Sequence, residues 1–85
     1  MKRLVETVEG EGFDKLLGER VTLFCVNYFY TGKLIGVNAD YVLLTEAAVV
    51  FETGPFTDKT WKDAQPLPHE IYVMKQAIEA FGIVK

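Results

Sequence analysis

The chain has 85 residues and a formal net charge of −3, and 49% of its residues are hydrophobic. This length suits one domain, residues 1–85, and the acidic balance argues against a surface that attracts nucleic acid everywhere through counterion release. The hydrophobic share exceeds what so small an isolated domain needs, which favours contact with another copy of the chain. No apolar run is long enough for a membrane span or a signal peptide, so we expect a soluble, cytoplasmic protein.

The first predicted elements are an arm and a short helix. Residues 1–12 are interrupted by two glycines, so they are expected to form a poorly specified arm. The apolar side chains between Phe13 and Leu17 fall at the spacing of one helix face, and Gly18 follows as a cap. The acidic residues of this region are expected to form a solvated face: Glu6, Glu9, Glu11, Asp14 and Glu19.

A hairpin is predicted next, because β-branched and aromatic residues become frequent. Residues 21–26 place apolar side chains on both faces of a strand, and Cys25 among them is interpreted as a small buried hydrophobe in a reducing compartment. After a short turn, residues 29–37 form a second strand. Gly32 and Gly36 within it permit a strong bend or the close approach of another backbone.

A third strand and a long loop follow. A turn at residues 38–40 leads to a strand that begins at Tyr41 and is expected to run on to Phe51. Residues 53–68 contain all three prolines and predict a long loop, with room for a small hairpin.

The tail, residues 69–85, fits two interpretations. Its apolar residues match a helical stripe that opens at Pro68 and closes at Gly82. Residues 71–73 instead favour a strand, and a barrel begun by three strands needs further strands to cover its edge. Local pattern leaves open a barrel that ends here and a three-stranded sheet with a C-terminal helix.

Few residues suggest chemistry. His69 is the only histidine, so neither a histidine–cysteine metal site nor a serine–histidine triad can be assembled, and we interpret it as structural. Phe56 and Trp61 could stack on single-stranded bases, but such residues more often pin a loop to the body. Tyr41 and Tyr72 are interpreted as packing residues. The sequence therefore predicts no enzyme, no cofactor and no metal site.

Two segments of the chain resemble the motifs of the Sm-like (LSm) family. The first motif is Gly32-Lys-Leu34-Ile-Gly-Val37-Asn38-Ala-Asp40-Tyr-Val-Leu-Leu44. The second motif is Met74-Lys75-Gln76-Ala77-Ile78-Glu79-Ala80-Phe81, which is similar to the form in the bacterial RNA chaperone Hfq. The resemblance covers residues 13–44 and 71–83.

The resemblance implies a mainly β fold: a five-stranded, strongly bent antiparallel barrel of the SH3 type with a short N-terminal helix. The tail would form two strands, near residues 71–75 and 77–83, and residues 53–68 would be the loop between the third and fourth strands. In this family the fourth strand of one subunit pairs with the fifth strand of the next, which closes a homo-oligomeric ring. The implied interface residues are Ile71, Val73, Ile78 and Ala80.

The resemblance also implies binding of RNA, or of single-stranded DNA, at the pore of the ring. Lys75 and Gln76 would face the nucleic acid, while Asn38 and Asp40 would offer hydrogen bonds around the rim. Asn38, Asp40 and Val42 stand where the family has an acidic residue, an aromatic or histidine, and an asparagine, so the usual uridine pocket is not expected. The alternative is a homo-oligomeric scaffold or protein-interaction ring without nucleic-acid binding, which the acidic pI favours.

Overall fold

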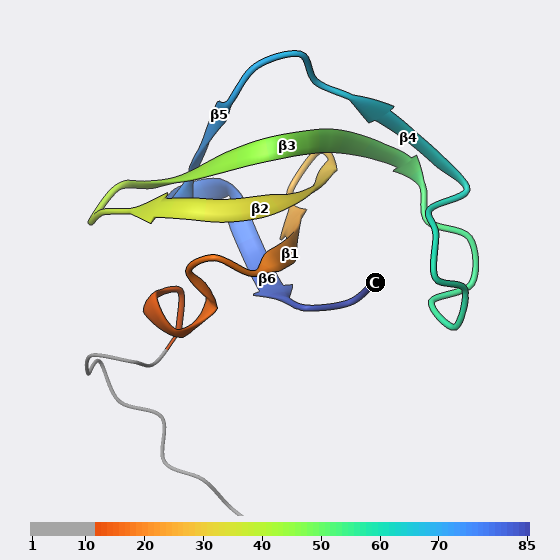
Figure 1. Cartoon of the computed structure of the whole chain (residues 1–85), viewed down its shortest axis with the longest axis horizontal. Helices are drawn as coiled ribbons and strands as arrows, with labels where there is room; N and C mark the ends of the chain where they lie inside the picture. The colour runs from red at the N-terminus through yellow and green to blue at the C-terminus, as the bar shows by residue number, and fades with distance from the viewer. Residues whose placement is uncertain (1–11) are drawn as a thin grey trace, which may run out of the picture.

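The computed structural model describes residues 12–85, which form one antiparallel sheet of six strands (Figure 1). The strands are β1 (Arg20–Cys25), β2 (Phe29–Val37), β3 (Tyr41–Glu52), β4 (Asp63–Pro66), β5 (Ile71–Met74) and β6 (Ile78–Gly82). Their order in the sheet is β4-β3-β2-β1-β6, and β5 also pairs with β3. The mainly β prediction is confirmed. Within residues 12–85, no helix is long and apolar enough to cross a membrane.

The predicted N-terminal helix is wrong in kind, because a single 3-10 turn, η1 (Asp14–Leu16), stands in its place. The apolar run is too short to nucleate an α-helix. Gly18 adopts a positive φ of +87° and donates its N–H to the carbonyl of Leu34 at 2.7 Å, which redirects the chain into the sheet. The predicted arm of residues 1–12 lies outside the described residues, apart from Gly12.

The structure has six strands instead of the predicted five, because an additional strand, β4, forms within the segment predicted as a loop, residues 53–68. β4 pairs with residues 48–52 of β3, and β5 pairs with residues 41–44 of the same strand. Pro66 is the last residue of β4 and Pro68 lies between β4 and β5, and proline has no N–H to continue a strand ladder. The end of the predicted loop, residues 53–68, therefore extends the sheet as β4.

The tail forms strands, so the alternative with a C-terminal helix is wrong. β5 and β6 lie within the two segments predicted as strands, and the helical residues between them are limited to one 3-10 turn, η2 (Lys75–Ala77). Along β5, Val73 is buried whereas Tyr72 and Met74 are exposed, which is the two-residue alternation of a strand.

The sheet is bent but does not close, so the predicted barrel is corrected to an open sheet. β6 pairs with β1, β5 pairs with β3, and no ladder joins β6 to β4 or β5 among residues 12–85. η2 redirects the chain by one turn instead of reversing it as a hairpin would. β6 therefore does not pair with β5; it pairs with β1 and forms the opposite edge of the sheet (Figure 1).

The core lies inside the bend, where a close approach of two backbones at Gly32 sets the curvature. A Cβ at Gly32 would stand 3.0 Å from the carbonyl oxygen of Thr45 and 3.1 Å from Cα of Ala47, and the β2–β3 pairing shifts at this point. The predicted role of Gly32 is confirmed. The buried core residues are Val21, Leu23, Cys25, Leu34, Val42, Leu44, Ala47 and Val73.

Substitution of Gly32 tests this constraint. We expect Gly32→Ala to lower the free energy of unfolding by about 1–3 kcal/mol, because the new methyl group presses on backbone atoms that cannot swing aside. Gly82→Ala is the matched control, since a Cβ there meets no atom within 4 Å. Chemical denaturation of both variants measures the difference, and equal stabilities would show that the bend does not depend on Gly32.

Candidate nucleic-acid interface at the turn between β5 and β6

Backbone hydrogen bonds hold the η2 turn, which carries Lys75 and Gln76, against two other parts of the sheet. The N–H of Lys75 donates to the carbonyl of Asp40 at 2.9 Å, and the carbonyl of Ala77 accepts from the N–H of Val26 at 3.0 Å. The first bond joins η2 to the turn between β2 and β3. Residues from the two motifs therefore meet in space.

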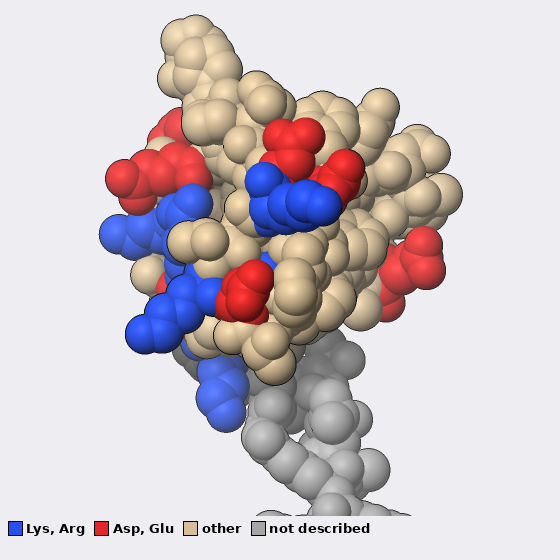
Figure 2. Space-filling model, turned by 90° about the vertical axis from the view of Figure 1, so that its right-hand side faces the viewer, with Lys and Arg blue, Asp and Glu red and all other residues tan. Residues whose placement is uncertain are grey.

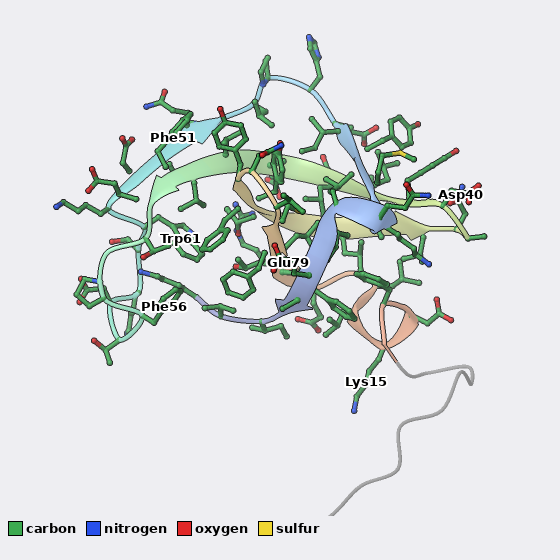
Figure 3. All side chains as sticks on the ribbon, turned by 180° about the vertical axis from the view of Figure 1, so that it is seen from behind. Lys15, Asp40, Phe51, Phe56, Trp61 and Glu79 are labelled. Carbon is green, nitrogen blue, oxygen red and sulfur yellow. The ribbon has the colours of Figure 1, made fainter. Side chains whose placement is uncertain are left out.

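The side chain of Asn38 forms the turn that faces η2. Its Oδ1 accepts from the N–H groups of Asp40 and Tyr41, both at 2.8 Å. Short polar side chains that bond their own backbone in this way are typical turn formers. Asn38 thus holds Asp40 in place and has its side-chain oxygen already engaged, while Asp40 lies exposed at one end of the molecule (Figure 3).

Three of the four predicted nucleic-acid residues line one shallow hollow of about 350 Å³. Asp40, Lys75 and Gln76 contribute to its wall, and Asn38 lies just outside it. The complete lining is Ala39, Asp40, Tyr41, Met74, Lys75 and Gln76. The structure therefore brings the predicted residues together, at a surface that combines one lysine with one carboxylate.

Lys75 also contacts an aromatic ring. Its Nζ lies 5.3 Å from the centre of the Phe13 ring, and Phe13 itself stacks on Phe81 of β6 with ring centres 3.8 Å apart. A cation over an aromatic face is attracted by the ring quadrupole. This contact orients the lysine while leaving the residue partly exposed.

Sequence reasoning missed an exposed aromatic pair beside the hollow. Tyr41 and Tyr72 meet edge to face, with ring centres 5.1 Å apart, and 64% of Tyr72 is accessible. Their interpretation as packing residues holds only for their contact with each other. In the β3–β5 pairing, Tyr72 is opposite Leu43, which shares a face of β3 with Tyr41, so both rings lie on one face of the sheet. No local sequence pattern reveals that pairing.

The predicted interface residues lie on β5 and β6. Val73 is buried in the core, Ile71 and Ile78 pack against it, and Ala80 is exposed. Strand pairing between subunits uses backbone groups, so the inward direction of three of these side chains does not test the predicted interface.

Phe56 and Trp61 lie at the opposite end of the molecule from Asp40 (Figure 3). Phe56 meets Phe24 of β1 with ring centres 6.4 Å apart, and Trp61 meets Phe56 at 6.3 Å. These contacts attach the loop between β3 and β4 to the body of the sheet, as the sequence suggested.

No group of three or more His, Cys, Asp or Glu residues within residues 12–85 is arranged to hold a metal ion. Comparisons of the chain with protein-family models, with curated proteins and with solved structures returned no match. The case for a function therefore depends on the geometry of the subunit.

Cys25 is buried, as predicted, and provides a pH test of the fold. Burial, and to a smaller extent the charge of Glu79, raises the pKa of its thiol above the ordinary value of 9.0. The unfolded chain then loses this proton before the folded protein does. The contribution of Cys25 to the free energy of unfolding is therefore fully present below about pH 9, and it is lost as pH rises from there through the folded pKa. We expect Cys25→Ala to flatten this decline in chemical denaturation, and an unchanged slope would show that other groups cause it.

Proposed function

We propose that the chain is an Sm-like subunit that assembles into a homo-oligomeric ring and binds RNA, or single-stranded DNA, without catalysing a reaction. The observation that carries this proposal is the β5–η2–β6 unit. In this unit, β5 and β6 lie at opposite edges of one open sheet, and the turn between them carries Lys75 and Gln76. We place the protein in the cytoplasm, where a reducing environment suits the free thiol of Cys25.

Unpaired strand edges support self-association. Within residues 12–85, β6 forms one edge of the sheet and β4 and β5 form the other, so each edge offers backbone donors and acceptors to another strand. Exposed apolar side chains flank both ends: Tyr72 and Met74 on β5, Phe81 on β6 and Ile83 just beyond it. Pairing β5 of one copy with β6 of the next is a head-to-tail contact, which forms a ring when the rotation closes.

Repetition of Lys75 around such a ring supports nucleic-acid binding. Each subunit would add one ammonium group to the same rim, which concentrates positive charge on an otherwise acidic protein. The exposed rings of Tyr41 and Tyr72 adjoin this rim and offer faces on which bases can stack. RNA chains that pass over the rim would then meet both a phosphate contact and an aromatic surface.

One observation favours the scaffold alternative. The carboxylate of Asp40 shares the hollow with Lys75, and a negative charge there opposes a phosphate. Acidic and basic side chains are also interspersed on the face shown in Figure 2, at the end of the sheet that carries the loop between β3 and β4. A ring that binds a protein partner would need no continuous basic surface.

Self-association is tested by placing a charge on the β5 edge. We expect Tyr72→Lys to raise the dissociation constant between subunits about tenfold or more, because the ammonium would lose water in the contact. Ile35→Lys is the control, since Ile35 is also exposed but lies on β2, which is paired on both sides. Light scattering across a concentration series gives the masses. A wild-type monomer at all concentrations would contradict the ring.

Nucleic-acid binding is tested through its dependence on salt. We expect wild-type protein to bind a labelled single-stranded RNA more weakly as salt rises, and Lys75→Ala to reduce the slope of log K against log salt by about 0.7 for each subunit in contact with phosphate. Lys33→Ala removes an exposed lysine of β2 and is expected to leave the slope unchanged.

Fluorescence anisotropy with RNA and DNA of the same sequence distinguishes the remaining possibilities. Assembly without salt-dependent binding would favour the scaffold over the nucleic-acid role. Binding that Lys75→Ala leaves intact would place the contact elsewhere on the subunit.

A further inference from the structure

The ammonium group of Lys85 is held by the loop between β3 and β4. Its Nζ donates hydrogen bonds to the backbone carbonyls of Thr53 at 2.6 Å, Pro55 at 2.9 Å and Thr60 at 3.0 Å. A lysine ammonium has three N–H donors, so each donor has its own acceptor. Carbonyl groups of a single loop thus satisfy the cation, and no carboxylate of residues 12–85 forms an ion pair with it.

Two aromatic rings complete the surroundings of the same nitrogen. It lies 4.6 Å from the centre of the Trp61 ring and 5.6 Å from that of Phe56, and the two rings stand at 89° to each other. Aromatic faces attract cations and contribute no hydrogen-bond acceptor of their own. We call this arrangement the ammonium cage, and its residues are Thr53, Pro55, Phe56, Thr60 and Trp61.

The cage is shaped by contacts that do not involve Lys85. Gly54 adopts a positive φ of +66°, and a Cβ there would stand 3.2 Å from Cβ of Lys62. The carbonyl of Pro55 accepts from the N–H of Asp58 at 3.0 Å, and Lys62 pairs with Glu52 at 3.3 Å where the loop leaves the strands. Together with the contact between Phe56 and Phe24, these features shape the loop through contacts that do not include Lys85.

We propose that the ammonium cage is a binding site for primary alkylammonium groups, the class to which lysine side chains belong, and that Lys85 occupies it as an internal ligand. Three convergent carbonyls select a group with three N–H donors. A quaternary ammonium has none, and an acetylated lysine has lost both its charge and two of its donors. This inference is independent of the proposed ring and of nucleic-acid binding.

An internal ligand has a high effective concentration, in the millimolar range for short flexible connections. Lys85 follows the end of β6 by three residues, so it remains near the cage whenever it dissociates. A free amine must compete with it. Loss of the charge on Lys85 would therefore open the site to a lysine from another molecule and release the segment after β6 from the loop.

The chain has a single tryptophan, so the intrinsic fluorescence of Trp61 reports on the cage alone. Lys85→Met removes the ammonium while keeping an unbranched side chain. We expect titration of this variant with n-butylammonium, at constant ionic strength, to change Trp61 emission in a saturable way. Tetramethylammonium is expected to give a much weaker response. Wild-type protein should need a concentration of n-butylammonium at least about tenfold higher for half of the fluorescence change, because Lys85 competes for the cage.

Lys59→Met is the matched control, since Lys59 belongs to the same loop but is exposed and makes no contact with the cage rings. It should titrate as wild type does. Lys85→Gln is a second neutral variant, and circular dichroism establishes that each protein is folded. No saturable response in either folded Lys85 variant would overturn the proposed site. Equal responses to both ammonium ions would overturn its selectivity for primary amines, and equal curves for wild type and Lys85→Met would overturn the internal competition.

Discussion

The pairing of β3 with three other strands is the constraint on which the rest of the structure depends. One edge of β3 is covered by β2, and the other is shared between β4 and β5. Because Met74 is opposite Tyr41, the chain enters η2 beside the turn between β2 and β3. Because Asp63 is opposite Glu52, the loop that forms the ammonium cage lies at the far end of the same strand. The length of β3 thus separates the two candidate sites.

Much of the sheet could be predicted from local pattern, because the first three strands are rich in β-branched residues and bounded by turn formers. The tail was ambiguous for a physical reason. Ile71, Met74, Ile78 and Phe81 are spaced like one face of a helix, but the three residues of η2 shift the alternation between the two strands. Met74 and Phe81 are in fact exposed, whereas Val73 is buried. Burial distinguishes the two interpretations, and hydrophobicity alone does not.

The candidate sites differ in how far sequence could reach them. Asp40 and Lys75 belong to recognisable turns, so their residues could be named in advance, although their contact depends on the β3–β5 ladder. The ammonium cage gave no signal, because its acceptors are backbone carbonyls, which every residue has. Its ligand also lies 25 residues from the nearest acceptor along the chain. The open sheet was missed because strand closure depends on the direction of η2 and not on the composition of the strands.

An open sheet has two edges, and the surroundings of these edges differ in this structure. β5 has no charged residue or proline on its exposed edge, which natural edge strands commonly use to prevent pairing with other chains. At the other end, Lys85 attaches the segment after β6 to the loop between β3 and β4 through side-chain bonds. That attachment occupies no N–H or carbonyl of β6 itself. Within residues 12–85, the attachment through Lys85 therefore does not compete with the strand pairing proposed between copies of the chain.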